Sequence, residues 1–268
     1  MPTDSLLTDP TEVPLRPAWL NQLGLSPDRH DYLRFSRTAT YGFLAALPLL
    51  VGYHTLILLA NGGQAGVRVG AEVWITRLLA AFGATGMLAL GAAVLLVGVG
   101  VLWWERKKAI PVRRRYLGMM VAESAVYAVV LAFTIGWFVG LLFAFAPEAM
   151  AAQVGRPDRF TLVALSLGAG IYEELVFRVI LVGGLFLALH RLAAWKRGRA
   201  YLVAAVVGAL IFSAVHYTGA LGDPFELSSF TFRFLFGLAL NAVFLVRGFG
   251  IAAWAHALYD VLVVTLLT

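Results

Sequence analysis

The chain has 268 residues, of which 60% are hydrophobic and 13% are charged, and its formal net charge is +6. Charged residues make up roughly 25% of an ordinary soluble domain, so this composition excludes a disordered chain, a nucleic-acid-binding domain and a typical cytosolic enzyme. It predicts instead a protein with several membrane-spanning helices. The sequence contains no cysteine, which excludes disulfides, cysteine-ligated zinc and cysteine nucleophiles.

In chain order, residues 1–37 form a polar segment rich in acidic residues and proline. A bilayer core about 30 Å thick is crossed by about 20 helical residues, and seven later stretches are apolar enough to cross it. The predicted spans are Ala39–Ala60, Leu78–Trp104, Tyr116–Ala146, Phe160–Leu189, Tyr201–Leu221, Phe230–Val246 and Ile251–Leu267. We therefore predict an all-α fold, a polytopic membrane bundle of about seven transmembrane helices. It divides into the polar segment (1–37), N-terminal transmembrane helices (38–158) and a C-terminal transmembrane core (159–268).

Basic residues in short loops predict the orientation of the bundle. The loops Glu105–Arg115 and His190–Ala200 are rich in Lys and Arg, whereas the loops at the other end are nearly charge-balanced. Loops rich in Lys and Arg stay in the cytoplasm. We therefore predict a cytoplasmic N-terminus and a C-terminus on the opposite side of the membrane.

Ionisable side chains lie inside three of the C-terminal spans. An Asp, Lys or Arg near the centre of a membrane helix costs about 2.5–3.5 kcal/mol, so such groups are expected to face one another or a water-filled cavity. The fourth span holds Glu173, Glu174 and Arg178, the fifth holds His216, and the seventh holds His256 and Asp260.

The spacing of these residues predicts which of them interact. Glu174 and Arg178 are four residues apart on one helix face, in the order that favours an ion pair. Glu173 lies about 100° around the same helix and is left to point at other spans. His256 and Asp260 are also four apart and share a face of the seventh span. One free carboxylate and two imidazoles, on spans 4, 5 and 7, are therefore expected to converge.

Four interpretations of this convergence remain open from the residues alone. In a glutamate-dependent peptidase, Glu173 and His216 activate a water molecule while His256 and Asp260 stabilise the oxyanion. In a zinc site, Glu173, His216 and His256 bind the metal, with Asp260 as a further candidate ligand. The same groups suit a proton relay in a transporter, although we find no internal repeat. Alternatively, they form a polar network that only holds helices together.

Three motifs resemble a known family. They are E-E-x-x-x-R at Glu173–Arg178, F-x-x-x-H at Phe212–His216 and H-x-x-x-(N/D) at His256–Asp260. In this order, on successive apolar spans, they resemble the CPBP family, also called Abi or type II CAAX-prenyl endopeptidase-like. The resemblance covers about residues 160–268, which makes this core the expected catalytic part of the chain. It implies an intramembrane glutamic protease.

The resemblance also implies a role for each residue. Glu173 corresponds to the general base, assisted by His216, and His256 with Asp260 corresponds to the oxyanion site. Glu174 and Arg178 correspond to a structural pair. The prenyl-protein proteases carry Asn where this chain has Asp260, and a carboxylate donates a hydrogen bond only when protonated.

The expected substrate is a membrane-associated protein or peptide, cleaved within the lipid bilayer, without a cofactor and without nucleic acid. The expected location is the prokaryotic inner membrane. Two alternatives remain, namely a non-enzymatic immunity or partner protein that keeps the fold, and a zinc-dependent protease with Glu173, His216 and His256 as ligands.

Overall fold

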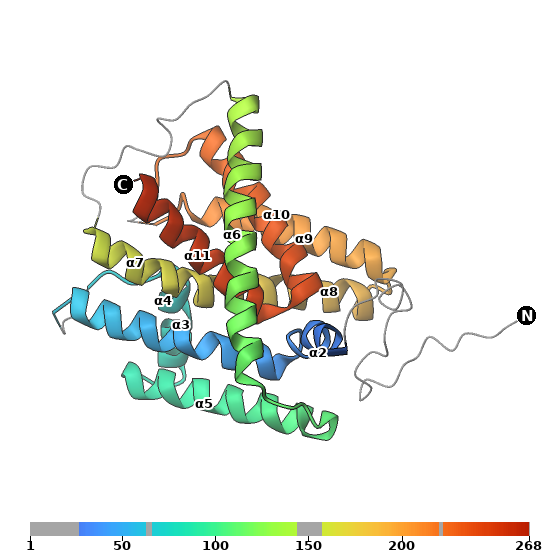
Figure 1. Ribbon diagram of the computed structural model, residues 1–268. Coiled ribbons are helices and arrows are strands. Elements are labelled where there is room, and N and C mark those ends of the chain that lie inside the picture. The colour runs from blue at the N-terminus through green and yellow to red at the C-terminus, as the bar shows by residue number, and fades with distance from the viewer. Residues whose placement is uncertain (1–26, 63–65, 144–156, 220–221, 268) are drawn as a thin grey trace, which may run out of the picture.

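The computed structural model describes residues 27–62, 66–143, 157–219 and 222–267, and these residues form helices and no strand (Figure 1). The all-α prediction is therefore confirmed. The helices are α2 (Pro27–Phe35), α3 (Ala39–Ala60), α4 (Gly70–Ala81), α5 (Gly86–Glu105), the 3₁₀-helix η1 (Arg106–Lys108), α6 (Arg114–Leu142), α7 (Arg159–Gly168), the π-helix η3 (Ala169–Val182), α8 (Gly183–Leu187), the π-helix η4 (Ala188–Leu192), α9 (Arg197–Val215), α10 (Leu227–Arg247) and α11 (Phe249–Leu267).

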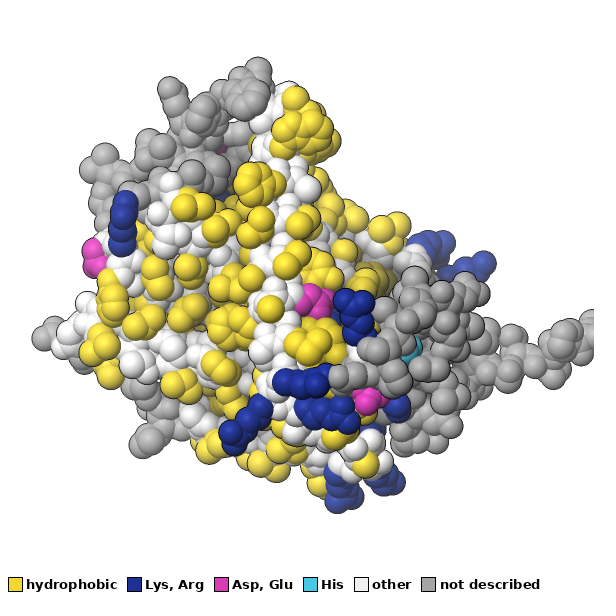
Figure 2. Space-filling model, in the orientation of Figure 1, with side chains coloured by type: hydrophobic (Ala, Val, Ile, Leu, Met, Phe, Trp, Pro, Cys, Tyr) yellow, Lys and Arg dark blue, Asp and Glu magenta, His cyan; other side chains and the backbone are white. Residues whose placement is uncertain are grey.

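Seven helical stretches of the described residues are long and apolar enough to cross a membrane, as predicted. They are Ala39–Ala60, Ala89–Lys108, Arg114–Leu142, Arg159–Leu192, Arg197–Val215, Leu227–Arg247 and Phe249–Leu266. Figure 2 shows hydrophobic side chains spread over the broad face that α6 crosses, and Lys and Arg gathered on the side where α2 and the α5–α6 connection lie. The protein is an integral-membrane helix bundle.

The second predicted span, Leu78–Trp104, is wrong in extent because the chain breaks inside it. Helix α4 ends at Ala81 and α5 begins at Gly86. Gly83 and Gly86 both adopt φ +79°, a conformation that residues with a Cβ rarely take. The hydroxyl of Tyr53 on α3 donates a hydrogen bond to the carboxylate of Glu72, which fastens α4 to α3.

The fifth predicted span, Tyr201–Leu221, is also too long. Helix α9 ends at Val215, and His216 is its C-cap. Just beyond it, Gly219 has φ +85°, and the N–H of Asp223 donates to the carbonyl oxygen of His216 over 2.9 Å. The chain thus turns back over the helix end, and Leu221 lies outside the described residues. His216 therefore lies at the C-terminal end of α9 rather than inside a membrane-spanning helix.

The fourth span is one helical run from Arg159 to Leu192. Asp158 is its N-cap. The Asp158 carboxylate accepts hydrogen bonds from the N–H (3.0 Å) and the hydroxyl (2.8 Å) of Thr161, and these bonds lower the pKa of Asp158. Its central part, η3, is a π-helix, in which each N–H bonds to the carbonyl five residues back. Such wider turns are rare and frequent at functional sites. Both glutamates of the E-E-x-x-x-R motif lie in η3.

Helix α11 occupies the centre of the bundle, where it packs against α3, α6, α7 and η3. Its inner faces carry alanines, among them Ala253 and Ala257, with no exposed surface. Opposite them on η3, a Cβ added to Gly170 would lie 2.5 Å from both the carbonyl oxygen of Ala253 and the Cβ of Ala257. Small residues on both elements therefore bring the backbones of η3 and α11 together.

Candidate active site

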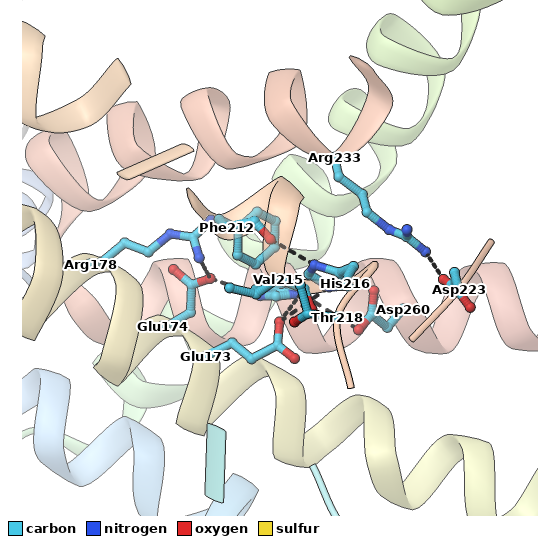
Figure 3. Close-up of polar contacts among 11 residues, drawn as sticks. Glu173, Glu174, Arg178, Phe212, Val215, His216, Thr218, Asp223, Arg233 and Asp260 are labelled. Carbon is cyan, nitrogen blue, oxygen red and sulfur yellow. Dashed lines mark hydrogen bonds and ion pairs between the residues drawn. The ribbon is translucent and has the colours of Figure 1, made fainter. Parts of the chain in front are cut away.

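The carboxyl group of Glu173 lies between two imidazole rings. Its Oε2 is 4.0 Å from Nε2 of His216 and 3.9 Å from Nε2 of His256. The three residues come from η3, the end of α9 and α11, and Figure 3 shows Glu173 and His216 turned toward one another. These separations are too long for direct hydrogen bonds, and polar groups so spaced are commonly bridged by a water molecule. The predicted convergence of one carboxylate and two histidines is thus present.

The ring of His216 is held in one orientation by its own helix. Its Nδ1 lies 2.7 Å from the carbonyl oxygen of Phe212. A carbonyl oxygen only accepts hydrogen bonds, so Nδ1 carries the proton and Nε2 of the neutral ring faces Glu173 as an acceptor. The ring of Phe212 packs edge-on against His216, with centroids 4.9 Å apart.

Behind Glu173, Glu174 joins two partners in a fully buried cluster. Nη1 of Arg178 lies 3.0 Å from Oε1 of Glu174, so the predicted spacing produces an ion pair. The same Oε1 lies 2.7 Å from Nδ1 of His256, a hydrogen bond that the sequence analysis did not anticipate. Cζ of Arg178 also lies 4.4 Å from the ring centroid of Phe212, a favourable cation–π contact. Glu174 therefore connects the arginine to one of the two site histidines.

Asp260 approaches His256 from the other side of the ring. Its Oδ2 lies 3.6 Å from Nε2 of His256, which is beyond hydrogen-bonding distance. Because Nδ1 of this histidine bonds to Glu174, its Nε2 faces the carboxyl groups of both Glu173 and Asp260. Asp260, the last residue of the H-x-x-x-(N/D) motif, is therefore part of the same site.

Aromatic side chains enclose the histidine on α11. Phe236 of α10 lies edge-on to His256 with centroids 5.3 Å apart, and Phe212 lies 6.0 Å from it. Phe177 of η3 packs in turn against Phe212 at 5.2 Å. Sequence reasoning did not select Phe236, because nothing distinguishes it from the other phenylalanines of the sixth span. These rings make the surroundings of His256 apolar, except where the carboxyl groups approach.

The chain that follows His216 is tied to α10 by an ion pair that the sequence analysis also missed. The guanidinium of Arg233 donates a hydrogen bond to the carboxylate of Asp223, and its Cζ lies 5.0 Å from the ring centroid of Tyr217. Figure 3 shows this pair beside Asp260, away from Glu174 and Arg178. The pair ties Asp223, which follows α9, to Arg233 of α10.

A further hydrogen bond positions η3 next to Glu173. The hydroxyl of Tyr172 and Nε2 of His54 on α3 lie 2.8 Å apart. The ring of Tyr172 also packs edge-on against Tyr53, with centroids 5.7 Å apart. Helix α3 thus supports the site although it lies outside the three motifs.

The geometry fits a zinc site poorly. Among the described residues, no group of three or more His, Cys, Asp or Glu side chains is arranged to hold a metal ion. Ligands of a tetrahedral zinc at its usual bond lengths lie about 3.3 Å apart, whereas Oε2 of Glu173 is 3.9 and 4.0 Å from the two Nε2 atoms. The absence of a metal from the mechanism nevertheless remains a prediction, which a chelator can test.

Comparison with known proteins identifies a family that resembles the C-terminal part of the chain. Residues 156–262 match the family model described as type II CAAX prenyl endopeptidase, Rce1-like. No curated protein and no solved structure matches the chain. The matched segment contains all three motifs, from Glu173 to Asp260, and therefore confirms the resemblance seen in the sequence.

Proposed function

From the match of residues 156–262 to the type II CAAX prenyl endopeptidase family, which is a family of membrane proteases, we propose that this protein is an intramembrane endopeptidase. It cleaves a peptide bond of a membrane-associated protein by means of a water molecule activated at Glu173. One observation carries the proposal, namely the placement of Oε2 of Glu173 at 3.9 and 4.0 Å from the Nε2 atoms of two histidines.

In the proposed first step, a water molecule lies between Glu173 and His216. Both groups accept hydrogen bonds from it, since Nδ1 of His216 already donates to Phe212. The water oxygen attacks the carbonyl carbon of the substrate while its proton passes to the Glu173 carboxylate. The tetrahedral intermediate then collapses, the C–N bond breaks, and Glu173 returns the proton to the leaving amine.

The oxyanion of this intermediate is proposed to lie at Nε2 of His256. Because Nδ1 of His256 donates to Glu174, Nε2 can donate to the oxyanion only if the ring carries both protons. The carboxylate of Glu174 stabilises such an imidazolium, and the apolar rings around it strengthen this interaction. Asp260, 3.6 Å from Nε2, either donates a second hydrogen bond in its protonated form or supports the charge of the ring.

Arg178 and Glu174 are proposed to act on the site indirectly. Neither side chain is exposed, so neither can contact substrate. Arg178 neutralises Glu174, and Glu174 orients the ring of His256. The location proposed for the protein is the prokaryotic inner membrane, with the N-terminus in the cytoplasm.

A proteomic comparison of native cells tests this function. Membrane and secreted proteins of cells that carry wild-type protein are compared with those of cells that carry Glu173→Gln. Under the proposal, at least one precursor accumulates uncleaved in the variant, and wild-type protein supplied in trans restores its cleavage. Identical sets of cleaved proteins in both strains, with equal amounts of the two variants in the membrane, would contradict the proposal.

A further inference from the structure

The site residues are exposed on one side only. On η3, the side chain of Glu173 is 17% exposed, whereas Arg178, one turn further along, is 1% exposed. On α11, His256 is 4% exposed and Asp260, one turn further along, is 28% exposed. At the end of α9, the side chain of His216 is 26% exposed, whereas Phe212, one turn earlier, is buried. In each of these three pairs, therefore, one residue is buried and the other is partly exposed.

The buried residues of the three pairs all lie nearer to the basic loops than their exposed counterparts do. The run that contains η3 ends at Leu192, just before the basic connection to α9, and α9 begins there at Arg197. Helix α11 begins at Phe249, just after α10 ends at Arg247. Tyr201, near the start of α9, donates a hydrogen bond to the carbonyl oxygen of Asn241 near that end of α10, so α11 begins on the same side. In each of the three pairs, the more exposed residue is thus the one that lies farther from the basic loops. At 1.5 Å per residue, the 19 residues of α9 place His216 about 28 Å along the axis from Arg197.

The end of the bundle where His216 lies has features of a membrane interface, and its charged residues differ in sign from those of the basic loops. The stretch 216–226 contains Asp223 and Glu226 and no Lys or Arg. It also carries an aromatic cluster, in which Tyr217 packs against Phe225 and Phe230 with centroids 5.2 and 6.1 Å away. Aromatic side chains gather at the level of lipid headgroups.

The other end of the bundle carries the basic interface. Arg106 lies over the ring of Trp103, 4.9 Å from its centroid, and Lys108 lies 5.5 Å from the ring centroid of Trp104. Lys and Arg of short loops remain in the cytoplasm. The end that holds these residues is therefore cytoplasmic, and the aromatic cluster around Tyr217 belongs to the other interface.

We infer that the site opens to the non-cytoplasmic face of the membrane, and that its substrates are extracytoplasmic segments of membrane-anchored or exported proteins. The Asp223–Arg233 pair and the aromatic cluster form the rim past which such a segment enters. On the cytoplasmic side, the Glu174–Arg178 pair and Phe212 separate the site from the basic loops. The substrate class rests on the proposed function, whereas the direction of the opening does not.

The direction can be tested by cysteine labelling, because the natural chain contains no cysteine that would react. Thr218 and Lys196 are exposed residues that follow and precede α9, so Thr218→Cys and Lys196→Cys probe the two ends of one helix. In intact cells, a membrane-impermeant maleimide is expected to label Thr218→Cys, and to label Lys196→Cys only after the membrane is permeabilised. Glu226→Cys and Lys107→Cys repeat the comparison at independent exposed positions. The reverse pattern, or equal labelling of both ends in intact cells, overturns the inference.

The substrate class is tested by mapping the protein N-termini that disappear in Glu173→Gln cells. These cleavage sites are expected in segments on the non-cytoplasmic side, within a few residues of a membrane span or anchor. Sites in cytoplasmic segments overturn the inferred substrate class. If no terminus disappears while the labelling pattern is as expected, the proposed protease function fails and the outward opening stands.

Discussion

Nδ1 of His256 lies 2.7 Å from Oε1 of Glu174, and the same oxygen lies 3.0 Å from Nη1 of Arg178. One oxygen of the buried Glu174 carboxylate thus connects the arginine of the E-E-x-x-x-R motif to His256, which lies 82 residues after Glu174. The hydrogen bond fixes the rotation of the imidazole ring and directs Nε2 toward Glu173. The two adjacent glutamates therefore have different surroundings and different expected roles.

The first prediction separates these roles. Glu173→Gln keeps the shape of the side chain but removes the proton acceptor, so we expect cleavage to fall by about 10² or more. The melting temperature should remain within error of the wild type, because Glu173 makes no short polar contact with its neighbours (the nearest ring nitrogens are 3.9 and 4.0 Å away). Both quantities are measured on protein purified in detergent.

Glu174→Gln is the matched variant for this experiment, since it makes the same chemical change one residue away. It should lower the melting temperature, because Arg178 then loses its charged partner. Normal cleavage by Glu173→Gln together with an inactive but fully stable Glu174→Gln would reverse the assignment of the two glutamates.

The second prediction concerns Arg178. Arg178→Ala leaves the Glu174 carboxylate buried and without its cation, and breaking such a buried pair costs about 3–5 kcal/mol. We expect a large loss of folded protein from the membrane, measured by quantitative blotting and by thermal unfolding. Arg191→Ala, which removes an exposed arginine from the end of the same helical run, should change neither quantity.

A double variant distinguishes stability from function at this pair. Glu174→Gln combined with Arg178→Met removes both charges, so much of the lost stability should return. Cleavage should stay low, because Nδ1 of His256 no longer bonds to a carboxylate. Full activity in this double variant would show that the charge on Glu174 does not support His256.

The third prediction concerns the contact between η3 and α11. A methyl group on Gly170 would lie 2.5 Å from the backbone oxygen of Ala253, so Gly170→Ala must push the two helices apart. We expect a loss of about 1–3 kcal/mol in stability, as for other overpacked sites, and a larger loss of cleavage because Glu173 moves away from His256. Gly184→Ala is the control, since a Cβ there meets no atom within 4 Å. Wild-type activity and stability in Gly170→Ala would contradict the close approach.

The fourth prediction concerns Asp260. In the metal-free mechanism Asp260→Asn retains substantial cleavage, because an amide can donate a hydrogen bond to the oxyanion without first being protonated. Asp260→Ala should lose about 10²–10³ in turnover, the usual cost of one oxyanion donor. The assay is peptide cleavage in detergent, with and without a strong chelator, combined with metal analysis of the purified protein. An inactive Asp260→Asn, together with a stoichiometric wild-type metal whose removal abolishes cleavage, would contradict this mechanism.

Much of the molecule can be predicted from the order of its residues. Long apolar stretches can satisfy their backbone groups in lipid only by forming helices, so the number of spans follows from hydropathy. The ionisable residues inside spans 4, 5 and 7 are too costly to face lipid, so their convergence follows as well. The Glu174–Arg178 pair follows from helical spacing.

Other features depended on the packed structure. The break between α4 and α5 and the end of α9 at Val215 lie next to glycines that take positive φ. The hydrogen bond from His256 to Glu174 depends on how closely α11 can approach η3 at Gly170. Spacing along one helix places groups on a face of that helix, but it contains no information on the distance to another helix. The side-chain volumes that meet at Gly170, Ala253 and Ala257 decide that distance, and with it the separation of Glu173 from His256.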